Sequence, residues 1–323
     1  MERQRAVPLL LAALTLLVGL SALTAAPRSL EPDPATGAPR LAGLVPKPLE
    51  EGPGLIAEGT CATLVYTPPD AEPEAGELCV PTNPNGAALV LVHGGGGFGG
   101  DRISMDTWVD LYQDAGYATL AVEYTVYDED SETPVYPDPE RDVKAAVQFL
   151  RQQAVDIGAD PGRIGLHGIS AGARLGAQAL VSAGDEWFEG DGVWPGVPDD
   201  VNALVGFYGY YEGDVVYPDV YYGGDADSDD PDVAERYEHA DSTAHASNAS
   251  GPALLVHGED DEVIPVDQTE RFAEALEDAD QDVTVEIARD AGHAFDGGND
   301  GEPLTEEGER IADLVLDWLA DHL

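Results

Sequence analysis

The sequence predicts an α/β fold, in which a mostly parallel sheet is covered by helices on both faces. Three observations indicate this fold. Short apolar runs of strand-forming composition recur along the chain, amphipathic helical stretches separate several of them, and 43% of the 323 residues are hydrophobic, enough for a large core. The length leaves one large domain or two smaller ones open.

The expected elements follow one another from residue 87 to the end of the chain. Six strands are expected at residues 87–93, 117–124, 163–169, 203–208, 253–257 and 283–288, with helices over residues 106–115 and 138–153 and after residue 170. The last helix carries apolar residues at i, i+3, i+4, i+7 and i+8, namely Ile311, Leu314, Val315, Trp318 and Leu319. This spacing puts them on one helix face, which we expect to be buried.

Two stretches interrupt the alternation, residues 185–200 and 210–248. We predict that both are insertions over the carboxyl edge of the sheet, where open α/β folds bind ligands. The second contains the acidic run 225–230, which begins like a calcium loop. Its sixth position is Asp230 instead of glycine and its twelfth is Arg236 instead of glutamate, so we expect a solvated acidic insertion and no metal site.

The N-terminus has the order of an export signal. Two arginines in the first five residues precede an apolar run that ends in small residues at 24–26. The run is also long enough to span a bilayer, so residues 1–26 are predicted to be a signal peptide or an uncleaved N-terminal membrane anchor. Residues 27–58 are expected to form a Pro/Gly-rich linker and residues 59–323 the main domain, which in either case lies outside the cytoplasm.

Two cysteines fit such a compartment. Cys61 and Cys79 flank a turn-rich stretch, and counting inward from both places them opposite each other across a hairpin. With an export signal and an even number of cysteines, a disulfide is expected. Two buried thiols are the alternative.

The charge balance excludes some partners. The chain has 63 acidic residues against 15 Lys plus Arg, a net charge of −48, so nucleic acid and anionic membranes are not expected to bind. Only two residues, Lys47 and Lys144, are lysines. A lysine-poor, carboxylate-rich composition predicts adaptation to high salt; an ordinary acidic secreted protein from a GC-rich genome is the alternative.

The strongest chemical signal is Gly168-Ile169-Ser170-Ala171-Gly172, which lies between an expected strand and an expected helix. A serine flanked in this way sits on a tight strand-to-helix turn that exposes its hydroxyl at the edge of the sheet. Ser170 is therefore a candidate nucleophile.

A glycine-rich loop, His93 to Gly100, follows the first expected strand of the alternation. Backbone without side chains lets several N–H groups point at one spot and hold a negative oxygen. A flexible loop or a phosphate cradle is the alternative, but a phosphate loop would need Gly-Lys-Ser/Thr, which is absent here.

Two further candidates follow the last two expected strands. Asp261 lies in a His-Gly-Glu-Asp-Asp-Glu-Val-Ile-Pro segment and His293 in a Gly-His pair. Serine is a poor nucleophile unless a base takes its proton, which His293 could do while Asp261 orients the imidazole.

Together these motifs resemble the α/β-hydrolase superfamily, in particular carboxylesterases of the hormone-sensitive-lipase-like branch and its feruloyl- and acetylxylan-esterase-like relatives. The resemblance covers residues 59–323. It implies Ser170 as nucleophile, Asp261 rather than Asp260 as the acid, His293 as base, and an oxyanion hole from the N–H groups of Gly95, Gly96 and Ala171. Ile169 replaces the aspartate usual before the serine in the hormone-sensitive-lipase-like branch, which favours the other relatives.

The resemblance implies an exported serine hydrolase that cleaves short-chain, aryl or acetyl esters, of small molecules or polysaccharides, without metal or cofactor. A peptidase, amidase or lipase of the same fold is the alternative enzyme, because the same residues attack amides. A non-catalytic binding protein is disfavoured, because all expected catalytic residues are present.

Overall fold

The computed structural model describes residues 30–32, 39–41, 56–127, 133–189, 192–213, 218–298 and 302–323. The chain divides into two compact units, Met1–Lys47 and Pro48–Leu323. In the first, strands β1 (Leu30–Pro32) and β2 (Pro39–Leu41) pair antiparallel, so the expected linker contains a short ladder. The predicted signal or anchor at residues 1–26 lies outside the described residues. Within the described ranges, no helix is long and apolar enough to cross a membrane.

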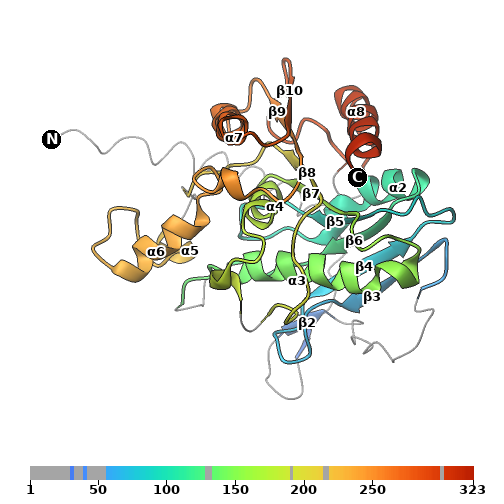
Figure 1. Ribbon diagram of the computed structural model, residues 1–323, viewed down its shortest axis with the longest axis horizontal. Coiled ribbons are helices and arrows are strands. Elements are labelled where there is room, and N and C mark those ends of the chain that lie inside the picture. The colour runs from blue at the N-terminus through green and yellow to red at the C-terminus, as the bar shows by residue number, and fades with distance from the viewer. Residues whose placement is uncertain are drawn as a thin grey trace. The chain divides into compact units, whose positions relative to one another are not determined.

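The described part of the second unit is built on one eight-stranded sheet in the order β10-β9-β8-β7-β5-β6-β4-β3 (Figure 1). All neighbours pair in parallel except β4 with β6 and β3 with β4. The α/β prediction is confirmed, and all six expected strands are present with small shifts at their ends. The strands are β3 (Thr60–Val65), β4 (Ala75–Val80), β5 (Ala88–Val92), β6 (Ala118–Val122), β7 (Ile164–Ile169), β8 (Ala203–Phe207), β9 (Ala253–Gly258) and β10 (Val283–Ala288).

Helices cover the two faces of this sheet. One face carries α2 (Asp106–Asp114) and α8 (Glu306–His322), and the other carries α3 (Asp138–Gln153), α4 (Ala171–Val181) and α7 (Asp267–Asp278). Strand β5 shows how the two cores form: Leu89 and Leu91 join the first, whereas Ala88, Val90 and Val92 join the second. Successive side chains of a strand point to opposite faces, so a central strand between two helical layers is apolar throughout.

The two predicted insertions carry short helices, and their apolar side chains form a small core together with Val135 and Tyr136. The first contains the 3₁₀ helix η3 (Glu186–Phe188), and the second contains α5 (Pro218–Tyr221) and α6 (Pro231–Ala240). In the acidic run, the side chain of Asp230 accepts the N–H of Asp232 and so caps α6. The described residues contain no cluster of His, Cys, Asp or Glu that could hold a metal ion.

The expected hairpin and its disulfide are both present. Strands β3 and β4 pair antiparallel with Cys61 directly opposite Cys79, their Cα atoms 4.0 Å apart, and the two residues form a disulfide. The bridge joins the edge strand of the sheet to its neighbour.

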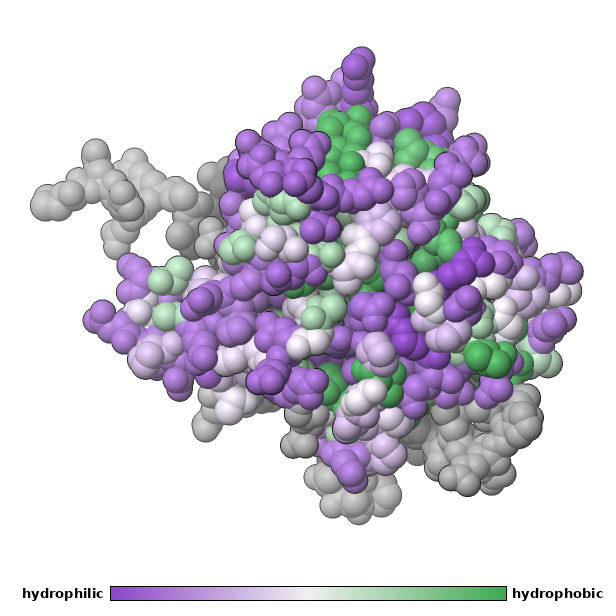
Figure 2. Space-filling model, viewed as in Figure 1, coloured by the Kyte–Doolittle hydropathy of each residue, from purple (hydrophilic) through white to green (hydrophobic). Residues whose placement is uncertain are grey.

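The surface carries little lysine. Figure 2 shows hydrophilic residues over most of the visible face. Lys144 is only 2% exposed, and its Nζ lies 2.7 Å from Asp199 Oδ2, whereas Lys47 is outside the described residues. Exposed positive charge in the described part of the chain therefore comes from arginine.

Candidate active site

The strand order brings two of the predicted motifs together. Strand β5 lies between β6 on one side and β7 on the other, so the loops after β5 and β7 meet at a switch point of the sheet. The glycine-rich loop follows β5 and Ser170 follows β7. A Cβ atom on Gly94 would lie 3.2 Å from the Cβ of Ser170, which shows how close the two loops are.

Ser170 occupies the strained turn that its motif predicts. Its φ of 53° and ψ of −116° place it between the end of β7 and the start of α4, in backbone that non-glycine residues rarely adopt. A Cβ on Gly172 would lie 2.1 Å from the carbonyl oxygen of Val92, and one on Gly168 would lie 2.2 Å from that of Gly172. Both glycines are therefore needed for α4 to start so close to the sheet.

Ser170, His293 and Asp261 form a continuous hydrogen-bonded row. His293 Nε2 lies 3.1 Å from Ser170 Oγ, and His293 Nδ1 lies 2.7 Å from Asp261 Oδ2. A carboxylate can only accept, so Nδ1 carries the proton and the lone pair of Nε2 faces the serine. The neighbouring Asp260 is exposed.

The carboxylate of Asp261 is held in its ionised form. Its side chain has no exposed surface, and burial alone would raise its pKa. Hydrogen bonds from His257 and His293 and from the backbone N–H of Ile264 outweigh burial and hold the pKa well below its usual value. The N–H groups of Val263 and Ile264 both lie 2.8 Å from Oδ1. Asp261 is therefore a fixed negative charge next to the imidazole.

Two of the predicted oxyanion donors, Gly95 and Gly96, follow Gly94, which lies next to Ser170, and the third, Ala171, directly follows the serine. The N–H groups of Gly95, Gly96 and Ala171 have no hydrogen-bond acceptor among the described residues, and Ala171 is the first residue of α4. At Gly95, φ is +118° and a Cβ would lie 1.9 Å from Gly99 O, so only glycine fits this turn of the loop. Free N–H groups in this position can receive a developing negative charge.

One aromatic contact and two hydrogen bonds that the sequence did not predict hold the start of this loop. Tyr124 stacks on His93 with ring centroids 4.3 Å apart and donates its hydroxyl to His93 O at 3.0 Å. Burial lowers the pKa of His93, so its imidazole is neutral, and Nδ1 donates to Gly94 O at 2.6 Å. The feature of the sequence that could have indicated Tyr124 is its position just after β6, because β6 is the neighbour of β5 in the sheet.

A second group of side chains lies behind His293: a tyrosine of the Tyr-rich stretch that begins at residue 208, and two residues, Trp108 and Asp296, that no motif indicated. The ring of Tyr208 packs edge-on against His293 at 4.7 Å, and its hydroxyl donates to Asp296 Oδ1 at 2.7 Å. Trp108 Nε1 donates to the other oxygen of Asp296 at 3.2 Å. Burial raises the pKa of Asp296. Tyr208 directly follows β8, at the carboxyl edge of the sheet that carries the other site residues. This position is the feature of the sequence that could have indicated it as a site residue.

A buried ion pair joins the serine helix α4 to α3, and a tyrosine of the second insertion bonds both of its partners. Arg174, four residues after Ser170, lies 2.7 Å from Glu140 Oε1, and the two side chains are 2% and 1% exposed. Tyr221 from α5 donates to the same oxygen at 2.9 Å and accepts from Arg174 Nη1 at 2.9 Å. A Cβ on Gly97 would lie 3.7 Å from the ring of Tyr221, so this tyrosine reaches the glycine-rich loop.

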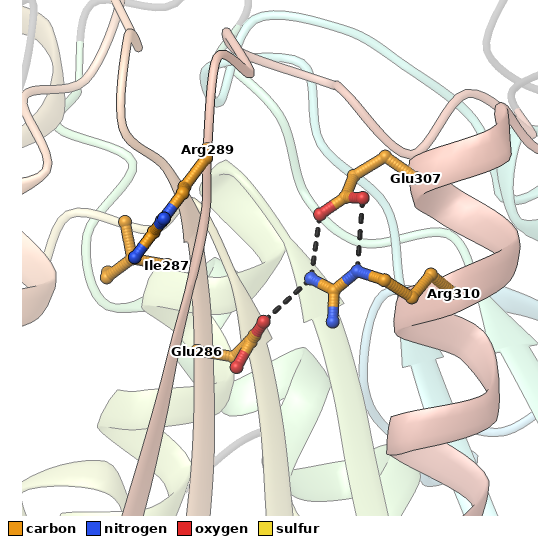
Figure 3. A pocket seen from close by; sticks show the side chains of 5 residues that line it. All are labelled: Glu286, Ile287, Arg289, Glu307 and Arg310. Carbon is orange, nitrogen blue, oxygen red and sulfur yellow. Dashed lines mark hydrogen bonds and ion pairs between the residues drawn. The ribbon is translucent and has the colours of Figure 1, made fainter.

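A separate hollow of about 320 Å³ lies between β10 and α8 (Figure 3). Its lining is Glu286, Ile287, Arg289, Glu307 and Arg310. Arg310 bonds both Glu286 and Glu307, as the dashed lines show. The lining includes none of the predicted site residues.

The strand order, the strained serine at the end of β7 and the hydrogen-bonded row define the class of protein: this is an α/β-hydrolase. A model of the BD-FAE family matches residues 78–276, more than half of the chain. The chain therefore belongs to the BD-FAE family, and the resemblance to α/β-hydrolase carboxylesterases is confirmed.

Curated relatives carry esterase names. Esterase LipQ of Mycobacterium tuberculosis is 30% identical over 192 residues, which is 55% of this chain and 42% of LipQ. Esterase LipC of the same organism is 27% identical over 242 residues, 67% of this chain and 55% of LipC. The matched part spans about half the length of these relatives.

Solved structures show the same fold. Esterase 2 of Thermogutta terrifontis with bound propionate superposes with a TM-score of 0.67 at 22% identity, covering 81% of this chain and 94% of that one. The same esterase phosphorylated by paraoxon has a TM-score of 0.65 at 20% identity, covering 82% and 95%. At this identity the likeness is one of fold.

Proposed function

We propose that this chain is a serine hydrolase that cleaves carboxylic esters through an acyl-enzyme. The observation that carries the proposal is the row from Ser170 Oγ through His293 to Asp261, with distances of 3.1 and 2.7 Å. The esterase names of its relatives LipQ and LipC support the same activity.

In the proposed mechanism, His293 Nε2 takes the proton of Ser170 as Oγ attacks the ester carbonyl carbon. The carbonyl oxygen becomes negative and is held by the N–H groups of Gly95, Gly96 and Ala171, each worth about 3 kcal/mol in a site of this kind. Asp261 stabilises the imidazolium.

His293 then gives the proton to the departing alcohol, and an acyl-Ser170 ester remains. Water attacks this ester while His293 again acts as the base, and the acid leaves with Ser170 restored. The chain's own side chains and backbone carry every step.

The substrate class we propose is a short-chain, aryl or acetyl ester, free or attached to a polysaccharide. Tyr221 of the second insertion lies beside the glycine-rich loop, and side chains in this place would set the acyl length. The propionate-bound relative is consistent with a short acyl group.

We also propose that the enzyme is exported, with residues 1–26 as signal or anchor, residues 27–58 as linker and residues 59–323 as the catalytic domain. The Cys61–Cys79 disulfide supports this location, because such bonds persist in oxidising compartments.

The test is the turnover of p-nitrophenyl acyl esters by Ser170→Ala. We expect activity to vanish while the unfolding temperature is retained, and activity in the folded variant would refute the proposal. Ser247→Ala, an exposed serine outside the site, is the matched control. A parallel aminoacyl p-nitroanilide assay separates esterase from peptidase, and esters graded by acyl length, with acetylated xylan and methyl ferulate, identify the substrate class.

A further inference from the structure

We propose that His257 is a positioning residue for this active site: it donates its Nε2 proton to the carboxylate oxygen of Asp261 that also receives the proton of His293. The inference rests on the proposed esterase function, because it concerns the same row of residues. His257 stands at the end of β9, four residues before Asp261.

The contacts of His257 are all internal. Its side chain has no exposed surface, and Nε2 lies 3.2 Å from Asp261 Oδ2 and 2.9 Å from the carbonyl oxygen of Ile264. Its Nδ1 lies 2.8 Å from the hydroxyl of Thr269, a fully buried residue of α7. The imidazole of His257 therefore connects the loop after β9, which carries Asp261, to helix α7.

These partners decide which nitrogen carries the proton. The Ile264 carbonyl and the ionised Asp261 can only accept, so the proton is on Nε2 and is shared between them. The lone pair on Nδ1 then accepts the hydroxyl proton of Thr269. Thr269 selects this form of the ring, and His257 is a donor toward Asp261.

The arrangement saturates the carboxylate. Oδ1 accepts two backbone N–H groups, those of Val263 and Ile264, whereas Oδ2 accepts the N–H of His293 and lies 3.2 Å from His257 Nε2, which we propose as its second donor. With one lone pair of Oδ2 occupied by His257, a single direction remains for His293. His257 therefore restricts the orientation of the imidazole that faces Ser170, in addition to stabilising a buried charge.

The experiment compares two amide replacements. A glutamine amide nitrogen can take the place of Nε2, whereas the shorter asparagine amide reaches only the place of Nδ1. We expect His257→Asn to lower kcat about tenfold at unchanged KM, equivalent to about 1.4 kcal/mol, and His257→Gln to remain within about threefold of wild type. Rates are taken per active site by titration with diisopropyl fluorophosphate.

A second readout needs no turnover. The low-field proton resonance of the His293–Asp261 hydrogen bond should move further downfield in His257→Asn, because Oδ2 then serves one donor, and should stay in place in His257→Gln. Unchanged kcat and an unchanged resonance in His257→Asn, or equal losses in both variants, would overturn the proposal.

If His257→Asn does not fold, Thr269→Val and Thr269→Ser repeat the comparison from the other side of the ring. The serine keeps the hydroxyl that faces Nδ1 and should behave as wild type, whereas the valine should shift the resonance. Equal behaviour of the two would count against His257. A wild-type protein that is inactive and does not react with diisopropyl fluorophosphate would refute the esterase function. The proton resonance would then still test the role of His257.

Discussion

Glu140→Gln should destabilise this protein far more than the loss of an exposed ion pair. Glutamine keeps the shape of the side chain, and its carbonyl can still accept from Arg174 and Tyr221. The variant therefore removes the charge and leaves the guanidinium of Arg174 buried without a counter-ion. Both side chains are at most 2% exposed, so water cannot replace the lost charge.

The size of the effect follows from the geometry. Opposite unit charges about 4 Å apart interact by about 4 kcal/mol at an effective dielectric constant of about 20, and breaking buried pairs costs about 3 to 5 kcal/mol. At about 2 °C per kcal/mol for a chain of this size, the melting temperature should fall by about 6 to 10 °C. Replacing Glu140 and Arg174 together by methionine should cost less than the single change.

Glu307→Gln is the matched control. Its carboxylate also lies 2.7 Å from an arginine, Arg310, but the two side chains are 33% and 48% exposed. Glu307→Gln should lower the free energy of unfolding by less than about 1 kcal/mol. This difference should vanish at molar NaCl, where the screening length is about 3 Å. Urea and thermal unfolding at low and molar NaCl measure both variants. Equal stability of Glu140→Gln and Glu307→Gln would refute the reasoning.

Two further predictions concern charge. The net charge of −48 repels itself, so the unfolding temperature and esterase activity should hold or rise as NaCl increases toward molar levels; a protein stable at low salt and inhibited at molar salt would contradict adaptation to salt. Burial, together with the neighbouring Asp142 and Glu123, raises the pKa of Glu74 from 4.5 to about 8. The folded state then holds a proton that the unfolded state releases, so stability should fall as the pH rises from about 4.5 to 8. Glu74→Gln should reduce the total fall in stability over this pH range by up to about 5 kcal/mol, as urea unfolding across the range would show; an unchanged fall would exclude Glu74 as its source.

Local patterns were sufficient where one element decides the geometry. The period of α8 predicted five residues on a buried face: Ile311, Val315, Trp318 and Leu319 are buried, and Leu314 is half-buried. Counting inward from Cys61 and Cys79 gave the hairpin register, because residues equally distant from the middle of the connecting turn lie opposite each other in an antiparallel pair. Helix α7 was missed, although its Phe272 and Leu276 are buried at helical spacing.

Contacts between distant segments could not be predicted in this way. Asp296 is bonded by Trp108 and Tyr208, which are 188 and 88 residues away along the chain. The Arg174–Glu140 pair joins two helices directly, and a tyrosine of an insertion that has no motif bonds both partners. Which side chains meet in this way depends on how the helices and the sheet pack together, and no residue spacing in the sequence encodes this packing.

The sequence by itself determined the α/β class, the candidate residues Ser170, Asp261 and His293, and their positions at strand ends, because strand and turn preferences act over a few residues. Only the tertiary structure decided that these three side chains meet within hydrogen-bond distance, and that His257 shares an oxygen of Asp261 with His293. The reason is physical: strand order and twist bring residues 32 and 123 positions apart in the chain to one edge, and hydrogen bonds form only between atoms placed to within a few tenths of an ångström.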